Sequence, residues 1–183
     1  DYLTPQMYWS SQAPRQSYKT LCNWLAKQVC EHFSNKLPNG QRVHLYASQA
    51  AYAITDANAG LSYYDDGIVE LERQLDINRA NLSSGYTGSV FFHTSAYLQL
   101  FRDIQESHFN YKALTPPMDW KDKEILAAPT NITIKDTVLS WEHPNAERYT
   151  LYVYPRGMLF EEAINNPEYL KRVVYGNNCR LDE

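Results

Sequence analysis

The chain has 183 residues, of which 44% are hydrophobic and 14% aromatic, so it can build a packed hydrophobic core. Its formal net charge of −4 argues against nucleic acid as a partner, because nucleic-acid binding needs a concentration of basic side chains. No apolar run approaches the roughly 20 residues of a membrane-spanning helix, so no membrane span is expected.

Three strand-and-helix pairs are predicted in the first part of the chain. The predicted strands are the segments rich in apolar residues, namely 2–9, 42–52 and 87–95. Apolar residues recur at the helical period in the segments that follow them, near 17–34, 67–82 and 95–107. Ser17 is expected to cap the first of these helices. Strands that alternate with helices are typical of a parallel sheet covered by helices.

The pattern changes after Tyr111. A Pro pair and a lack of periodicity predict a linker over 113–128. Beyond it, segment 131–141 predicts two short strands that turn at Lys135–Asp136, and further strands are predicted at 148–157 and 170–176. Short antiparallel strands of this kind indicate a β-sandwich. The predicted division is therefore a first domain over 1–112, the linker over 113–128, and a second domain over 129–183.

Neither predicted domain has the size of a complete fold. A β/α barrel contains eight strand-helix units in about 250 residues, whereas three are predicted here. A fibronectin-type sandwich has about seven strands in about 100 residues, whereas about four are predicted after the linker. Each domain is thus expected to be part of a larger one. Open sheet edges invite pairing with other chains, so self-association is a further expectation.

Four runs in the first two thirds of the chain resemble the second half of the barrel of the glycosyl-hydrolase-like family 10: DYLTPQMYW, HLYASQAAYAI, GSVFFHTSAYL and ALTPPMDW. The later runs APTNITI, LSWEHP and RYTLYVYPRG resemble the fibronectin type III-like module that often follows this barrel. The resemblance implies the C-terminal portion of a TIM-type barrel, comprising its last three strand-helix units, followed by a truncated fibronectin III-like β-sandwich. It also implies a secreted or lipid-anchored bacterial protein that acts on a polysaccharide or cell-wall glycan.

Candidate binding residues follow the predicted strands, because the functional groups of a TIM barrel lie at the carboxyl ends of its strands. This rule selects Gln6, Tyr8 and Trp9 after the first strand, Gln49 and Tyr52 after the second, and His93 after the third. Aromatic rings stack on the C–H faces of sugars and amides bind their hydroxyls, so the set predicts a carbohydrate site. Each member has a structural alternative: the amides could hydrogen-bond inside the barrel, Tyr8 and Trp9 could pack under a loop, and His93 could be a structural histidine.

Catalytic residues cannot be assigned from the sequence. Glycoside hydrolysis usually needs two carboxyl groups that flank the scissile bond. Asp1 stands at the wrong end of its predicted strand, Asp65 and Asp66 fit a helix-capping role, and Glu70 lies on a helix that should cover the outside of the barrel. The catalytic carboxylates are therefore expected on strands upstream of Asp1. Two other hypotheses stay open: a parent protein that binds glycan or peptidoglycan without cleaving it, and a purely structural module.

No metal or cofactor is expected. The three cysteines show no C-x-x-C spacing. The sequence also contains no glycine-rich phosphate loop, no nucleophile elbow and no H-E-x-x-H motif. Cys22 falls on the apolar face of the first predicted helix and is expected to be a buried, inert thiol.

Overall fold

The computed structural model describes residues 2–33, 36–37, 42–56, 58–118, 120–121 and 125–182. These residues form two compact units, one of Asp1–Asn110 with Pro116–Asp122 and the other of Tyr111–Thr115 with Lys123–Glu183. Part of the predicted linker therefore packs onto the first unit. Nε2 of His44 lies 3.1 Å from the carbonyl oxygen of Pro117, and the rings of His44 and Trp120 are 5.1 Å apart.

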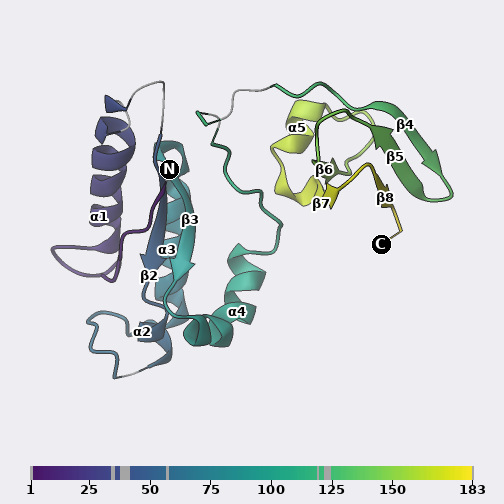
Figure 1. The fold of residues 1–183 in the computed structure, drawn as a ribbon. Helices are drawn as coiled ribbons and strands as arrows, with labels where there is room; N and C mark the ends of the chain where they lie inside the picture. Colours follow the sequence, from purple (N-terminus) through teal and green to yellow (C-terminus); the bar gives the residue numbers. More distant parts are fainter. Residues whose placement is uncertain are drawn as a thin grey trace. The chain divides into compact units, whose positions relative to one another are not determined.

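A three-stranded parallel sheet in the order β1-β2-β3 forms the centre of the first unit (Figure 1). Its strands are β1 (Tyr2–Leu3), β2 (His44–Gln49) and β3 (Tyr86–Phe91). β1 is shorter than the predicted strand because Pro5 has no backbone N–H to donate. The chain nevertheless stays beside β2: the amide of Ser48 donates to the carbonyl of Pro5 over 3.0 Å, and the amide of Met7 donates to the carbonyl of Ser48 over 2.8 Å. The described strands do not close into a barrel.

A bulge in β3 decides which of its side chains face the helices. Leu45 pairs with Tyr86 and the next residue of β2, Tyr46, pairs with Gly88, so Thr87 is left without a partner in the register. Because successive side chains of a strand point to opposite faces, this extra residue places Tyr86 on the helix side and Gly88 on the opposite side beside the ring of Tyr46.

Three helices of the first unit agree with the predicted periodicity, whereas the two short helices at 52–55 and 82–84 were not predicted. The helices are α1 (Tyr18–Leu25), which continues as the π-helix η1 (Ala26–Phe33), then α2 (Tyr52–Thr55), α3 (Ile68–Ala80), the short 3-10 helix η4 (Leu82–Ser84) and α4 (Thr94–His108). The predicted cap is confirmed, since the hydroxyl of Ser17 accepts a hydrogen bond from the amide of Thr20. No helix of the described residues has the length and apolar character needed to cross a bilayer.

The predicted capping role of Asp65 and Asp66 is wrong. Gly67 occupies the N-cap position of α3 with a φ of 59°, a conformation that glycine adopts more readily than other residues. Its cap carries no side-chain hydrogen bond. Asp66 instead accepts hydrogen bonds from Nη1 of Arg73 over 2.5 Å and from Nε2 of the Gln12 side chain over 2.7 Å.

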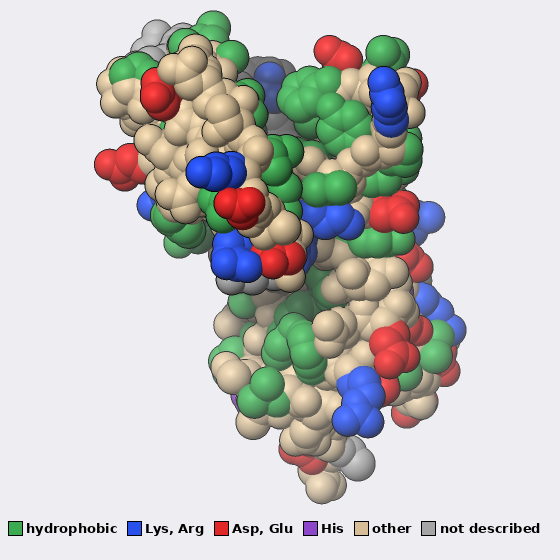
Figure 2. Space-filling view, turned by 90° about the vertical axis from the view of Figure 1, so that its right-hand side faces the viewer, with side chains coloured by type: hydrophobic (Ala, Val, Ile, Leu, Met, Phe, Trp, Pro, Cys, Tyr) green, Lys and Arg blue, Asp and Glu red, His purple; other side chains and the backbone are tan. Residues whose placement is uncertain are grey.

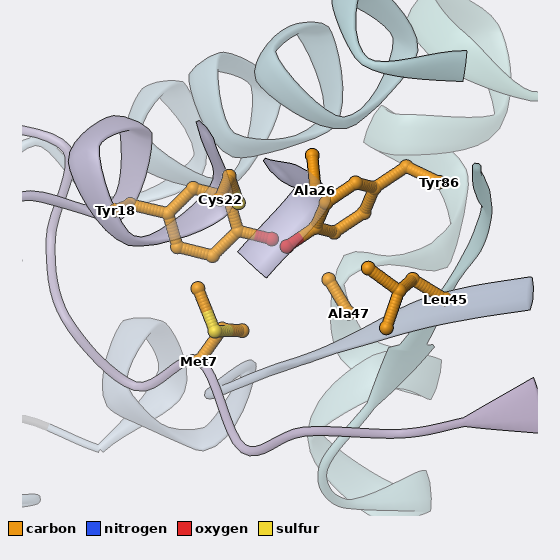
Figure 3. Close-up of a cluster of buried hydrophobic side chains, with 7 residues drawn as sticks. All are labelled: Met7, Tyr18, Cys22, Ala26, Leu45, Ala47 and Tyr86. Atoms are coloured by element: carbon orange, nitrogen blue, oxygen red, sulfur yellow. The ribbon is translucent and has the colours of Figure 1, made fainter. Parts of the chain in front are cut away.

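Two hydrophobic clusters pack against the sheet. The first joins α1 to the strands and contains Met7, Tyr18, Cys22, Ala26, Leu45, Ala47 and Tyr86 (Figure 3). The hydroxyl ends of Tyr18 and Tyr86 point toward one another within it. The second cluster joins α3 to α4 and contains Ala51, Leu71, Leu75, Ala96, Leu100 and Ile104. Cys22 is buried as expected, with its thiol 3.7 Å from Oδ1 of Asn78.

The second unit consists of two small antiparallel sheets that share one core. One sheet has the order β4-β5-β8, and β6 pairs with β7 in the other. The strands are β4 (Thr130–Lys135), β5 (Val138–Glu142), β6 (Arg148–Tyr152), β7 (Leu170–Tyr175) and β8 (Asn178–Arg180), with α5 (Phe160–Ile164) and the 3-10 helix η5 (Pro167–Tyr169) between β6 and β7. Trp141, Val174 and Cys179 form the buried core.

The first hairpin of this unit turns one residue later than predicted. Asp136 and Thr137 both have positive φ values, 48° and 68°, and lie between β4 and β5. β8 and α5 were not predicted, because they are too short for a recognisable periodicity. Figure 2 shows that hydrophobic side chains reach the surface between acidic and basic ones on one face of the molecule.

Candidate functional site

Four rings gather at the carboxyl edge of the parallel sheet. Tyr8 follows β1, Tyr52 opens α2 just after β2, and Phe92 and His93 follow β3. The ring centroid of Tyr52 lies 6.0 Å from that of Tyr8, 5.9 Å from that of Phe92 and 6.4 Å from that of His93. Tyr8 and Phe92 are 6.1 Å apart. We call these four residues the aromatic patch. Three of them, Tyr8, Tyr52 and His93, belong to the set predicted from the sequence.

Backbone hydrogen bonds hold the segments of the aromatic patch in place. The amide of Phe92 donates to the carbonyl of Gln49 over 2.9 Å, and the amide of Tyr52 donates to the carbonyl of Phe92 over 3.1 Å. The chain therefore continues the pairing of β2 and β3 for a short distance beyond the sheet. The rings after these two strands are fixed to one another by the main chain and do not depend on side-chain packing alone.

The aromatic patch presents both apolar and polar groups to solvent. Phe92 is 50% exposed and His93 is exposed, while Tyr8 and Tyr52 are half-buried. Nδ1 of His93 shares a hydrogen bond of 2.7 Å with the hydroxyl of Ser95. Among the described residues no hydrogen bond to Nε2 of His93 is found. Rings with a polar tip at the edge of an apolar surface suit ligands that are partly apolar and partly hydrogen-bonding.

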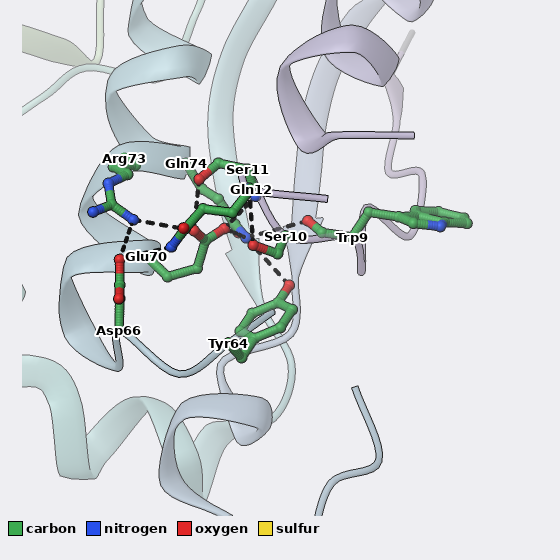
Figure 4. A network of polar contacts seen from close by, with 9 residues as sticks. All are labelled: Trp9, Ser10, Ser11, Gln12, Tyr64, Asp66, Glu70, Arg73 and Gln74. Carbon is green, nitrogen blue, oxygen red and sulfur yellow. Dashed lines mark hydrogen bonds and ion pairs between the residues drawn. The ribbon is translucent and has the colours of Figure 1, made fainter. Parts of the chain in front are cut away.

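The other predicted binding residues lie elsewhere in the first unit. Trp9 is 43% exposed, and its indole points away from the polar side chains around it (Figure 4). Gln6 is exposed and forms an isolated bridge with Ser48 through its backbone. Gln49 is fully buried, and its amide donates to Oε1 of Gln74 on α3 over 3.4 Å. Gln49 was predicted either to contact a ligand or to hydrogen-bond in the interior, and its geometry in the structure is that of the interior amide. It lies outside the aromatic patch.

A buried carboxylate lies beside the segment that follows β1. Glu70 is fully buried in the first turn of α3. Its Oε1 accepts hydrogen bonds from the backbone amide of Ser11 over 2.6 Å and from Nε2 of Gln74 over 2.8 Å, and its Oε2 accepts one from the hydroxyl of Ser11 over 2.6 Å (Figure 4). A buried charge needs such partners, because without them its desolvation is strongly unfavourable. The expectation that Glu70 faces outward is wrong.

Gln74 extends this network toward the carboxyl edge of the sheet. Its Nε2 lies 3.4 Å from the carbonyl oxygen of Trp9 and 3.2 Å from the hydroxyl of Tyr64. Burial raises the pKa of Tyr64 to about 12, although the hydrogen bond from Gln74 acts in the opposite direction. Tyr64 therefore stays protonated at neutral pH. We call Ser11, Glu70, Gln74 and Tyr64 the polar network.

Sequence reasoning missed the polar network, although a signal was present. The buried face of α3 carries Glu70, Gln74 and Asn78 at a spacing of four residues, beside the apolar pair Leu71 and Leu75. A polar stripe at helical spacing next to an apolar one indicates side chains that hydrogen-bond in the interior. Other carboxylates considered from the sequence are Asp65, Asp66 and Asp1. Asp66 pairs with Arg73, and Asp1 lies outside the described residues.

Comparisons with known proteins give one similarity. No family model matches the chain, and no solved structure matches it. The chain is 31% identical over 126 residues to the glycosyl hydrolase YngK of Bacillus subtilis (strain 168), a stretch that covers 67% of this chain and 22% of that protein. The chain thus spans about a fifth of the length of this relative. The similarity supports a glycosidase-like relationship for the chain.

Proposed function

We propose that this chain forms a glycan-binding wall of a glycoside hydrolase-like protein, with the aromatic patch and Trp9 as its contact residues. The observation that carries the proposal is the convergence of Tyr8, Tyr52, Phe92 and His93 at the carboxyl edge of the parallel sheet. Parallel sheets with helical connections bind their ligands at this edge. The similarity to a protein named as a glycosyl hydrolase supports the same class of ligand.

The strand pairing also supports a proposal for the fold. We propose that β1, β2 and β3 with their helices are a sector of a TIM-type barrel, and that the second unit is a partial fibronectin III-like sandwich. The parallel strands are joined by helices that lie on one face of the sheet, which supports the barrel sector. The exposed side chains of Val90 on β3 and Phe92 just after it also support the barrel sector. Two antiparallel sheets around Trp141 support the partial sandwich.

We propose that binding, and not bond cleavage, is the contribution of these residues. Glycoside hydrolysis uses one carboxylic acid and one carboxylate on either side of the scissile bond. Both oxygens of Glu70 are occupied by protein donors, and Asp66 is engaged by Arg73 and Gln12. The cleaving carboxylates would then belong to other parts of the full-length protein. A full-length protein that binds glycan without releasing sugar would favour the non-catalytic alternative.

A titration with defined oligosaccharides tests the proposal. The chain is titrated calorimetrically with a panel of soluble cell-wall and plant-polysaccharide oligomers, and the products are analysed for cleavage. We expect binding of at least one oligomer and no cleavage. Phe92→Ala should weaken that binding about fivefold to tenfold, the loss expected for one stacked ring. Leu98→Ala, which removes an exposed apolar side chain of α4, is the matched control and should leave the affinity unchanged.

Two outcomes would contradict the proposal. If Phe92→Ala and Tyr52→Ala bind the oligomer as tightly as the unaltered chain, the aromatic patch is not the contact surface. If the unaltered chain cleaves any oligomer, the division between binding and cleavage is wrong. A chain that binds none of the panel at millimolar concentration would count against carbohydrate as the ligand class.

A further inference from the structure

We propose that Glu70 is a positioning residue that fixes the Trp9–Gln12 segment and thereby the direction in which Trp9 is presented. The ligand part of this inference rests on the proposed glycan-binding function, whereas the structural part does not. Glu70 touches neither the aromatic patch nor a solvent-exposed surface, and it acts through Ser11 and Gln74.

Ser11 is attached to Glu70 at two points. Its backbone amide and its hydroxyl donate to different oxygens of the same carboxylate, each over 2.6 Å. Two bonds from one residue to one planar acceptor fix both the position and the rotation of that residue. Hydrogen bonds to a carboxylate are stronger than those between neutral groups, and burial strengthens them further. Ser11 lies two residues after Trp9, so the attachment limits how far Trp9 can move.

Only a carboxylate can accept all of the hydrogen bonds that Glu70 receives. In its three short hydrogen bonds Glu70 is the acceptor, and the donors are the amide and hydroxyl of Ser11 and Nε2 of Gln74. In the part of the chain that the structure describes, Glu70 has one ion-pair partner, Nη1 of Arg73, 3.8 Å from Oε2 on a side chain that is 43% exposed. A buried carboxylate with so little charge compensation costs desolvation energy that an amide would avoid. Glutamine at this position, however, would present an NH2 group to one of these donors.

Gln74 links Glu70 to Trp9 and Tyr64. Oε1 of Glu70 orients Nε2 of Gln74, which lies 3.4 Å from the carbonyl oxygen of Trp9. The same nitrogen lies 3.2 Å from the hydroxyl of Tyr64, on the loop before α3. Two segments from different parts of the chain are therefore attached to one turn of α3. Figure 4 shows that the indole of Trp9 projects away from Glu70 and Gln74.

Fluorine NMR of the chain labelled with 5-fluorotryptophan tests the inference without any ligand. The four tryptophans give four resonances, and Trp9→Phe identifies one of them. We expect Glu70→Gln to shift or broaden the Trp9 resonance while the resonance of Trp24, on α1, stays in place. Ser11→Ala, which removes the hydroxyl and keeps the backbone amide, should have a smaller effect in the same direction. Glu72→Gln, the same exchange at a carboxylate of α3 that faces His108 and lies outside the polar network, is the control and should leave Trp9 unchanged.

The outcomes separate the positioning role from the proposed function. An unchanged Trp9 resonance in Glu70→Gln and Ser11→Ala would overturn the positioning role, and Ser11→Ala alone decides if Glu70→Gln does not fold. Equal changes at Trp9 and Trp24 would also overturn it, because they would indicate a general structural effect. If the unaltered chain binds an oligosaccharide, Glu70→Gln should weaken binding about fivefold. If it binds none, the proposed function fails while the fluorine result still stands.

Discussion

A buried hydrogen-bond cluster joins α1, α3 and β3, and its loss should be measurable in the stability of the first unit. The hydroxyl of Tyr18 donates to Oδ1 of Asn78 over 2.9 Å, and Nδ2 of Asn78 donates to the hydroxyl of Ser89 over 2.9 Å. Tyr18 is fully buried, and burial holds its pKa well above the usual range. Tyr18→Phe removes one donor and leaves Oδ1 of Asn78 with the weak, 3.7 Å contact from Cys22. We expect this change to cost about 1–2 kcal/mol.

A double-mutant cycle makes this prediction specific. Asn78→Ala should cost about 2–3 kcal/mol, because it leaves the Tyr18 hydroxyl buried without its acceptor and also removes the bond to Ser89. The double variant should be less destabilised than the sum of the single variants, by about 1 kcal/mol. Urea unfolding of the chain labelled with fluorotryptophan, followed at Trp24, reports on this unit. Tyr63→Phe, at a side chain that is 49% exposed, is the control. Additive single effects, or a neutral Tyr18→Phe, would refute the reasoning.

Three further changes test local features of the fold. Gly88→Ala places a Cβ 2.9 Å from two ring carbons of Tyr46 and should cost about 1–2 kcal/mol in urea unfolding, and the cost should disappear in a Tyr46→Ala background. Burial raises the pKa of the Cys22 thiol from 9.0 to about 11, so the folded state holds this proton more tightly, and stability should fall by up to about 2–3 kcal/mol as the pH rises through this range. Cys22→Ala should flatten that alkaline decline, and an unchanged slope would refute the assignment. Asp66→Asn, which breaks the exposed pair with Arg73, should change stability by less than about 1 kcal/mol, and a larger loss would show that the pair matters more than its exposure suggests.

Periodicity predicted the helices better than the ends of the strands. Apolar residues at helical spacing located α1, α3 and α4 to within a few residues, because each helix buries one face against the sheet. The strand around Pro5 was predicted as continuous, whereas the ladder is interrupted there because proline lacks an N–H. The turn between β4 and β5 lies at Asp136 and Thr137, one residue later than predicted. Which residues take positive φ depends on the pairing of β4 with β5, which composition does not show.

The candidate site could be predicted in part. The rule that residues after parallel strands converge selected Tyr8, Tyr52 and His93, which meet in the structure together with Phe92. The same rule selected Gln49, but this residue lies on the face of β2 that points toward α3. Successive side chains of a strand point to opposite faces, so a shift of one residue decides whether a side chain faces the helices or the other side of the sheet. Glu70 was overlooked because a charged residue on a covering helix is expected to face solvent. Its burial depends on Ser11, which is 59 residues away in the sequence.

The position of bound glycan on the chain tests the central claim most directly. The chain is labelled with carbon-13 in its tyrosine rings, and an oligosaccharide that binds is titrated in while the ring resonances are followed by NMR. Our account predicts that the resonances of Tyr8 and Tyr52 shift with the same saturation curve. The resonance of Tyr175, which is 70% exposed on β7 of the second unit, should not move. Shifts confined to tyrosines of the second unit, with Tyr8 and Tyr52 unchanged at saturation, would contradict the account.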